Sequence, residues 1–140
     1  MITLAQYFGE FHDHPDATKE REGNAETLLM ACDNLEEMAI ADGVAFPDNH
    51  ETSSGISGVR YGGFRPQDCN IGAKHSSHKE GLAVDRYDPY GTIDAWCMMN
   101  SGKGGKLEQC GIYIEHPDYT KGWSHWTIKA PPSCHRVFIP

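Results

Sequence analysis

The segment Ser76-Ser77-His78-Lys79-Glu80-Gly81-Leu82-Ala83-Val84-Asp85 constrains the fold more strongly than any other part of this 140-residue chain. It contains a histidine and an aspartate with a glycine between them. A turn at Gly81 followed by a short strand would aim both side chains at one point, because alternate strand residues share a face and Asp85 then lies beside Ala83. An imidazole and a carboxylate placed in this way are two of the ligands that a zinc site needs.

A third ligand is expected from the segment Trp123–Ile128 (WSHWTI), which has the composition of a strand. Catalytic zinc usually has three protein ligands and a fourth position for water. His125 lies in this predicted strand among tryptophans, where a buried imidazole needs a polar partner. By spacing alone, His78, Asp85 and His125 are compatible with a metal site, but a set of hydrogen-bonded histidines is the favoured interpretation.

One long helix is predicted in the first third of the chain. Asn24 is its expected N-cap, since an asparagine side chain accepts a hydrogen bond from a free backbone N–H, and Gly43 suits the left-handed residue after its end. Apolar residues follow the i, i+3, i+4, i+7 spacing of one helix face: Leu28, Ala31, Cys32, Leu35, Met38 and Ala39.

Shorter elements are predicted in the second half of the chain. Helices precede strands, which favours an α+β fold with a small, mostly antiparallel sheet, flanking helices and long loops. The length fits a single domain over residues 1–140. The predicted elements are helices at Asp94–Asn100 and Lys106–Cys110, followed by strands at Gly111–Glu115 and Trp123–Ile128.

Composition excludes several classes of function. A net charge of −8 argues against a nucleic-acid partner, which would require a basic surface, and against an anionic membrane. The first ten residues lack a basic region followed by an apolar core, so synthesis in the cytoplasm without a signal peptide is expected. The five cysteines include no C-x-x-C pair, which argues against a disulfide framework and a cysteine-rich zinc site.

The chain resembles the M15 family of zinc peptidases, which includes D-Ala-D-Ala carboxypeptidases and phage cell-wall endopeptidases. It is most similar to a phage and prophage subgroup, nearly from end to end. The family motif S-x-H-x-x-G-x-A-x-D is matched in full, and so is a later W-x-H strand. The matching residues are Ser76, His78, Gly81, Ala83, Asp85, Trp123 and His125, with Ser57-Gly58, Phe64-Arg65-Pro66, Asn70, Asp88-Pro89 and Arg136–Pro140.

This resemblance implies a hedgehog/DD-peptidase-like fold with one Zn²⁺ per chain, held by His78, Asp85 and His125. It implies that a zinc-activated water hydrolyses peptide bonds in peptidoglycan stem or cross-link peptides, next to D-alanine. The protein would then be phage or prophage encoded, as an endolysin or virion component, and would act on the cell wall after release. Whether it is an endopeptidase or a carboxypeptidase, which wall chemistry it recognises and its oligomeric state stay open.

The general base departs from the family pattern. Many members carry Glu or Asp three residues before the last histidine, where this chain has Gly122. Glu115 is the predicted substitute, because it closes the strand expected to pair with the His125 strand. Asp118 and Glu80 are the alternatives, whereas His116 is expected to be a surface histidine of the H-P-D turn rather than a proton-transfer group.

An arginine is expected to stabilise the oxyanion or to hold a substrate carboxylate, since its planar fork fits such groups. Arg65 is assigned this role because its spacing to Asn70 follows the family pattern R-P-x-x-x-N. Arg60 competes, since it lies closely after Ser57-Gly58.

Two other functions compete with a peptidase. The glycine at position 122 favours a non-catalytic, zinc-containing virion or cell-wall-binding module with the same fold. A zinc amidase that cuts between muramic acid and L-alanine is disfavoured by the order of the motifs alone.

Overall fold

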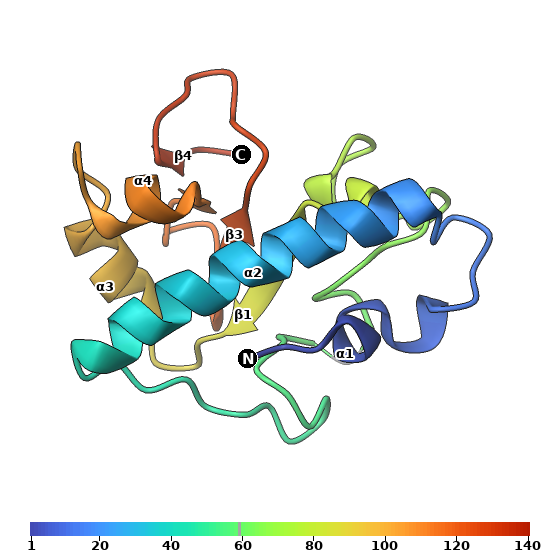
Figure 1. Ribbon diagram of the computed structural model, residues 1–140, viewed down its shortest axis with the longest axis horizontal. Helices are drawn as coiled ribbons and strands as arrows, with labels where there is room; N and C mark the ends of the chain where they lie inside the picture. Colours follow the sequence, from blue (N-terminus) through green and yellow to red (C-terminus); the bar gives the residue numbers. More distant parts are fainter. Residues whose placement is uncertain (59) are drawn as a thin grey trace.

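The computed structural model describes residues 1–58 and 60–140, and its longest element is helix α2 (Lys19–Ala41). Figure 1 shows α2 crossing the molecule in front of the sheet, with α1 (Leu4–Phe8) beside it. Among the described residues, no helix combines the length and apolar character needed to span a membrane.

The predicted long helix is confirmed, but its predicted start was wrong. The N-cap is Thr18, whose side-chain oxygen accepts a hydrogen bond from the Arg21 N–H. Asn24 lies inside the helix, where its Nδ2 donates to the carbonyl of Glu80 at 2.8 Å. At the other end, Gly43 has a φ of 87°, which agrees with the expected left-handed residue.

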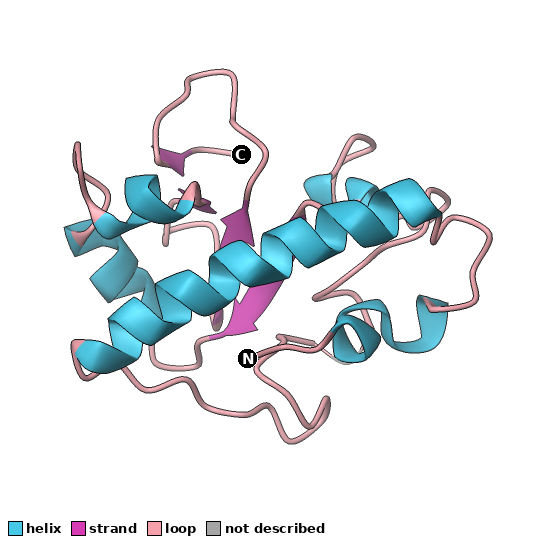
Figure 2. Cartoon of the chain, viewed as in Figure 1, coloured by secondary structure: helices cyan, strands magenta, loops and turns pink. Residues whose placement is uncertain are grey.

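Within residues 1–58 and 60–140, four strands form one sheet in the order β1-β3-β2-β4. Figure 2 shows the strands in magenta, with the long helix α2 passing in front of them. β1 pairs with β3 and β3 with β2 in antiparallel fashion, and β4 joins β2 in parallel. The α+β class with a mostly antiparallel sheet is therefore confirmed. The strands are β1 (Ala83–Tyr87), β2 (Tyr113–Glu115), β3 (Trp123–Thr127) and β4 (Val137–Phe138).

Short helices complete the fold. The helices predicted near residues 94–100 and 106–110 are present, the first of them starting two residues earlier than expected. They are α3 (Thr92–Met99) and α4 (Lys106–Cys110), with two 3₁₀ turns, η1 (Gly9–Phe11) and η2 (Ser77–Glu80).

The two faces of the sheet differ in polarity: one packs into the apolar core, and the other carries polar side chains. Val84 pairs with Trp126 across β1 and β3, and both are fully buried in the apolar core with residues of α2 such as Leu28. Because side chains alternate along a strand, the next pair, Asp85 with His125, projects from the opposite face. The core thus fixes the register that brings these two polar residues together.

A loop packs along the free edge of β1. The Ser57 N–H donates to the carbonyl of Asp85 at 2.8 Å, and the Asp85 N–H donates to that of Gly62 at 2.7 Å. Gly63 packs so closely on α1 that a Cβ added to it would lie 2.1 Å from the Tyr7 carbonyl oxygen. This close approach holds the loop against the polar face of the sheet.

Candidate metal centre

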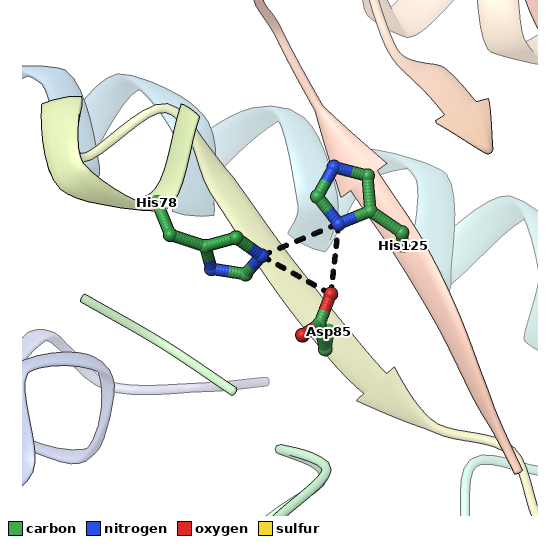
Figure 3. Close-up of side chains that lie close together, drawn as sticks. All are labelled: His78, Asp85 and His125. Carbon is green, nitrogen blue, oxygen red and sulfur yellow. Dashed lines mark hydrogen bonds and ion pairs between the residues drawn. The ribbon is translucent and has the colours of Figure 1, made fainter. Parts of the chain in front are cut away.

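Three side chains from separate elements converge on the polar face of the sheet: His78 from η2, Asp85 from β1 and His125 from β3 (Figure 3). Asp85 Oδ1 lies 3.2 Å from His78 Nε2 and 2.8 Å from His125 Nδ1. The two ring nitrogens are 3.3 Å apart, and all three residues are buried. The atoms are close enough for all three to bind a single metal ion.

The local sequence explains how His78 reaches this point. Gly81 has a φ of 76°, a conformation that residues with a Cβ rarely adopt, and it ends η2 and starts the turn into β1. A Cβ at Gly81 would also lie 2.5 Å from the Arg21 carbonyl oxygen, so α2 approaches the turn closely. The predicted turn and strand are confirmed, and they turn His78 back toward Asp85.

Hydrogen bonds to residues outside the cluster orient two of its three side chains, His78 and Asp85. His78 Nδ1 lies 2.7 Å from the carbonyl oxygen of Gly63. A carbonyl only accepts, so Nδ1 carries the proton and Nε2 keeps its lone pair for a metal. Arg65 Nη2 donates to Asp85 Oδ2 at 2.8 Å, which leaves Oδ1 facing the imidazoles.

The electrostatics favour the protonation states that bind metal. Burial lowers the pKa of His78, with the Asp85 carboxylate acting in the opposite direction. Burial alone would raise the pKa of Asp85, but the neighbouring imidazoles of His78 and His125 hold this pKa below its ordinary value. His78 is therefore neutral and Asp85 ionised near neutral pH, as ligands must be.

The three ligands lie in a cavity of about 490 Å³ that Arg65, Glu115 and Trp123 also line. We refer to it as the central cavity. In the antiparallel pairing of β2 with β3, Ile114 is opposite Trp126, so the register continues to bring Glu115 alongside His125. Burial raises the pKa of Glu115, while His125 acts in the opposite direction.

The other acidic candidates are not at the cavity. Among the described residues that line it, Glu115 and Asp85 carry the side-chain carboxylates. Glu80 instead pairs with Lys129, and Asp118 is exposed beside His116. Gly122 has a φ of 90°, which disfavours any residue with a Cβ, so the backbone here does not suit an acidic side chain at the usual family position.

The two arginine candidates have different surroundings. Arg65 is 8% exposed, lines the central cavity and donates from Nε to the Tyr61 carbonyl at 2.6 Å. The Arg60 side chain is 52% exposed and forms an ion pair with Glu10 at 2.7 Å. The structure thus places Arg65 beside the ligands and leaves Arg60 outside the central cavity.

Some residues at the site were not identified from sequence. The carbonyl of Gly63 orients His78, yet a backbone acceptor has no side-chain signature. The ring of Phe138 in β4 lies edge-on to His125 at 6.3 Å between centroids and lines the central cavity. The signal for Phe138 was the terminal segment R-V-F-I-P, which contributed to the resemblance without an assigned role.

A second group of ligand-type side chains is weaker. His14, Asp16 and Asp68 offer atoms within 4.8 Å of one another. Asp16 already accepts the Gln67 N–H at 2.7 Å and lies 3.7 Å from the Arg21 guanidinium. These partners satisfy the Asp16 carboxylate, so the His78–Asp85–His125 cluster is the candidate centre.

Comparisons with protein-family models, with curated proteins and with solved structures find no match to this chain. The functional proposal below therefore rests on the geometry of this cluster and on the sequence motifs.

Proposed function

We propose that the protein is a zinc-dependent metallopeptidase that hydrolyses peptide bonds in peptidoglycan stem or cross-link peptides, adjacent to D-alanine. The observation that carries the proposal is the buried cluster of two imidazoles and one carboxylate that shares a cavity with a further, non-ligating carboxylate, Glu115. Three ligands with a nearby base form the arrangement found in zinc hydrolases.

Zinc fits the donor set of this site. Zn–N and Zn–O bonds of about 2.0–2.1 Å in a tetrahedron place the ligand atoms about 3.4 Å apart. The ligand atoms of the cluster are 2.8, 3.2 and 3.3 Å apart. Magnesium and calcium prefer shells built entirely from oxygen, whereas two imidazoles suit zinc.

When bound, zinc supplies Lewis acidity and lowers the pKa of water toward neutrality. The side chains of the chain itself provide the remaining functions. Glu115 accepts the proton of the attacking water and returns it to the leaving amine nitrogen. A carboxyl pKa raised by burial brings Glu115 closer to the working pH of such a base.

Arg65 has a positioning role, because its bond to Asp85 Oδ2 fixes the carboxylate that binds zinc through Oδ1. A guanidinium has five N–H donors, and the described hydrogen bonds use one to Tyr61 and one to Asp85. We infer that a remaining donor faces the substrate oxygen on which negative charge develops.

The choice of peptidoglycan, and of a phage or prophage source, rests on the resemblance to the M15 family. The competing function is a zinc-containing wall-binding module without turnover, which the glycine at position 122 favours. The position of Glu115 in the central cavity favours the enzyme, because it supplies the carboxylate that Gly122 does not.

The test is digestion of purified peptidoglycan by the zinc-loaded protein, with fragments identified by mass spectrometry. We expect new amino termini at D-alanine bonds, and no products after zinc is removed by a chelator. Release of free L-alanine-terminated stems from muramic acid would identify an amidase. Wall binding without fragments from any wall type would support the non-catalytic module.

A further inference from the structure

Two further hollows adjoin the central cavity on different sides. One, of about 490 Å³, shares His75, Ser77, Phe138 and Pro140 with it. The other, of about 370 Å³, shares Arg65, Asp85 and Trp123. The two sets of shared residues have no member in common, so the hollows adjoin different parts of the central cavity.

The three spaces follow strand β3. Every second residue of the strand lies on the same face, so Trp123, His125 and Thr127 share one face. Trp123 lines the 370 Å³ hollow, His125 the central cavity and Thr127 the 490 Å³ hollow. At about 3.3 Å per residue, the distance from Trp123 to Thr127 is about 13 Å. An extended peptide of about four residues covers the same length, with the candidate metal centre near its middle.

The two hollows differ in chemistry. We call the hollow at Thr127 the apolar arm, since its lining includes Ala130, Pro131, Pro132 and Ile139. The first three belong to the segment that loops away after β3 and returns at β4 (Figure 1), and Ile139 directly follows β4.

We call the hollow at Trp123 the cationic arm, since Arg60 and Arg65 line it. Asp85 also lines it and pairs with Arg65, so the guanidinium of Arg60 is the one that a substrate can meet there. Arg60 is paired with Glu10, but this pair is exposed and contributes little, so a substrate carboxylate can replace Glu10 at small cost.

We propose that the substrate lies as an extended peptide along β3, with residues in both arms, and that the enzyme cuts an internal bond. An internal carboxylate of the substrate, not its C-terminus, faces Arg60 in the cationic arm, and small apolar residues occupy the apolar arm. This inference rests on the proposed peptidase function and makes the protein an endopeptidase. A carboxypeptidase requires the chain to stop beside the metal, whereas here space continues on both sides.

The experiment uses a peptidoglycan stem pentapeptide in two forms, one with both ends blocked by acetyl and amide groups and one with a free C-terminal carboxylate. The zinc-loaded protein should cut the same internal bond of both, at rates within about threefold, since little energy is assigned to a terminal charge. Release of only the terminal residue, and only from the free acid, would overturn the endopeptidase inference while leaving a zinc peptidase. No hydrolysis of either peptide or of whole walls would overturn both.

Two exposed substitutions test the arms themselves. Arg60→Gln and Ile139→Asp should each raise KM for the blocked peptide about fivefold with little change in kcat, because neither side chain lines the central cavity and the lost contacts are partly solvated. Lys103→Gln and Ile40→Asp are matched controls on exposed positions outside both arms. Equal KM values for the arm variants and their controls would contradict the proposed path of the substrate.

Discussion

Substitution of Gly63 by alanine tests whether the loop beside β1 orients the metal ligand His78. The new Cβ would lie 2.1 Å from the Tyr7 carbonyl oxygen, whereas ordinary contact begins at 3.4 Å. The loop must therefore shift by roughly 1 Å, because α1 and the loop meet through backbone atoms that have no rotamer to change. Such a shift stretches the 2.7 Å bond from His78 Nδ1 to the Gly63 carbonyl beyond hydrogen-bonding distance.

Without this hydrogen bond the His78 ring is free to rotate, and its proton is no longer held on Nδ1. Outer-shell partners of this kind change metal affinity by about 10- to 100-fold, which corresponds to about 1.4 to 2.7 kcal/mol. The assay is competition for zinc with a chelator of known affinity, after circular dichroism has shown that the variant is folded.

Gly23→Ala is the matched control, since a Cβ there meets nothing within 4 Å and the residue lies in α2. It should leave zinc affinity unchanged and stabilise the helix by about 0.5–1 kcal/mol. A folded Gly63→Ala protein with native zinc affinity would refute the role assigned to the Gly63 carbonyl.

Three further predictions concern the base, the pH dependence and the long helix. Glu115→Gln should lower kcat by about 10²- to 10⁴-fold with full zinc content, as expected for a general base, and unchanged turnover would exclude Glu115. Without metal, the folded protein should lose stability as the pH falls below about 6.5, by at most about 1.4 kcal/mol per pH unit from His78. The sign follows because the pKa of His78 is lower in the folded state, so the unfolded chain takes up the proton first. Urea unfolding in chelator at pH 7.5 and 5.5 measures this loss, and a His78→Gln protein with an equally steep pH dependence would contradict it. Thr18→Ala should cost about 1 kcal/mol by removing the N-cap of α2, whereas Thr27→Ala, on an exposed side of the same helix, should cost nothing; equal melting temperatures of the two variants would contradict the cap.

The ligand set was assigned from the resemblance to the M15 motif, because spacing alone favoured hydrogen-bonded histidines over a metal site. Gly81 marks the turn, and strand alternation puts Asp85 and His125 on faces that pair once β1 and β3 align. The expected pairing of the Gly111–Glu115 strand with the His125 strand indicated Glu115. Local patterns thus predicted the turn and the strands, whereas the choice of the three ligands needed the family motif.

Features that depend on tertiary packing could not be predicted in this way. Thr18 replaced Asn24 as the N-cap because α2 extends a further turn and a half, where Asn24 instead bonds to the Glu80 carbonyl. The difference between Arg60 and Arg65 depends on how the loop folds over β1. The Gly63 carbonyl could not be predicted as the hydrogen-bond acceptor for His78, because every residue has a backbone carbonyl.

The central claim is that His78, Asp85 and His125 bind one zinc ion, and zinc content measures it most directly. Elemental analysis of zinc-saturated, dialysed protein should give about one zinc per chain. His78→Ala and His125→Ala should each lose this zinc, while His12→Ala, an exposed histidine remote from the cluster, should retain it. A native chain without zinc, or full zinc content in the His78→Ala protein, would contradict the account.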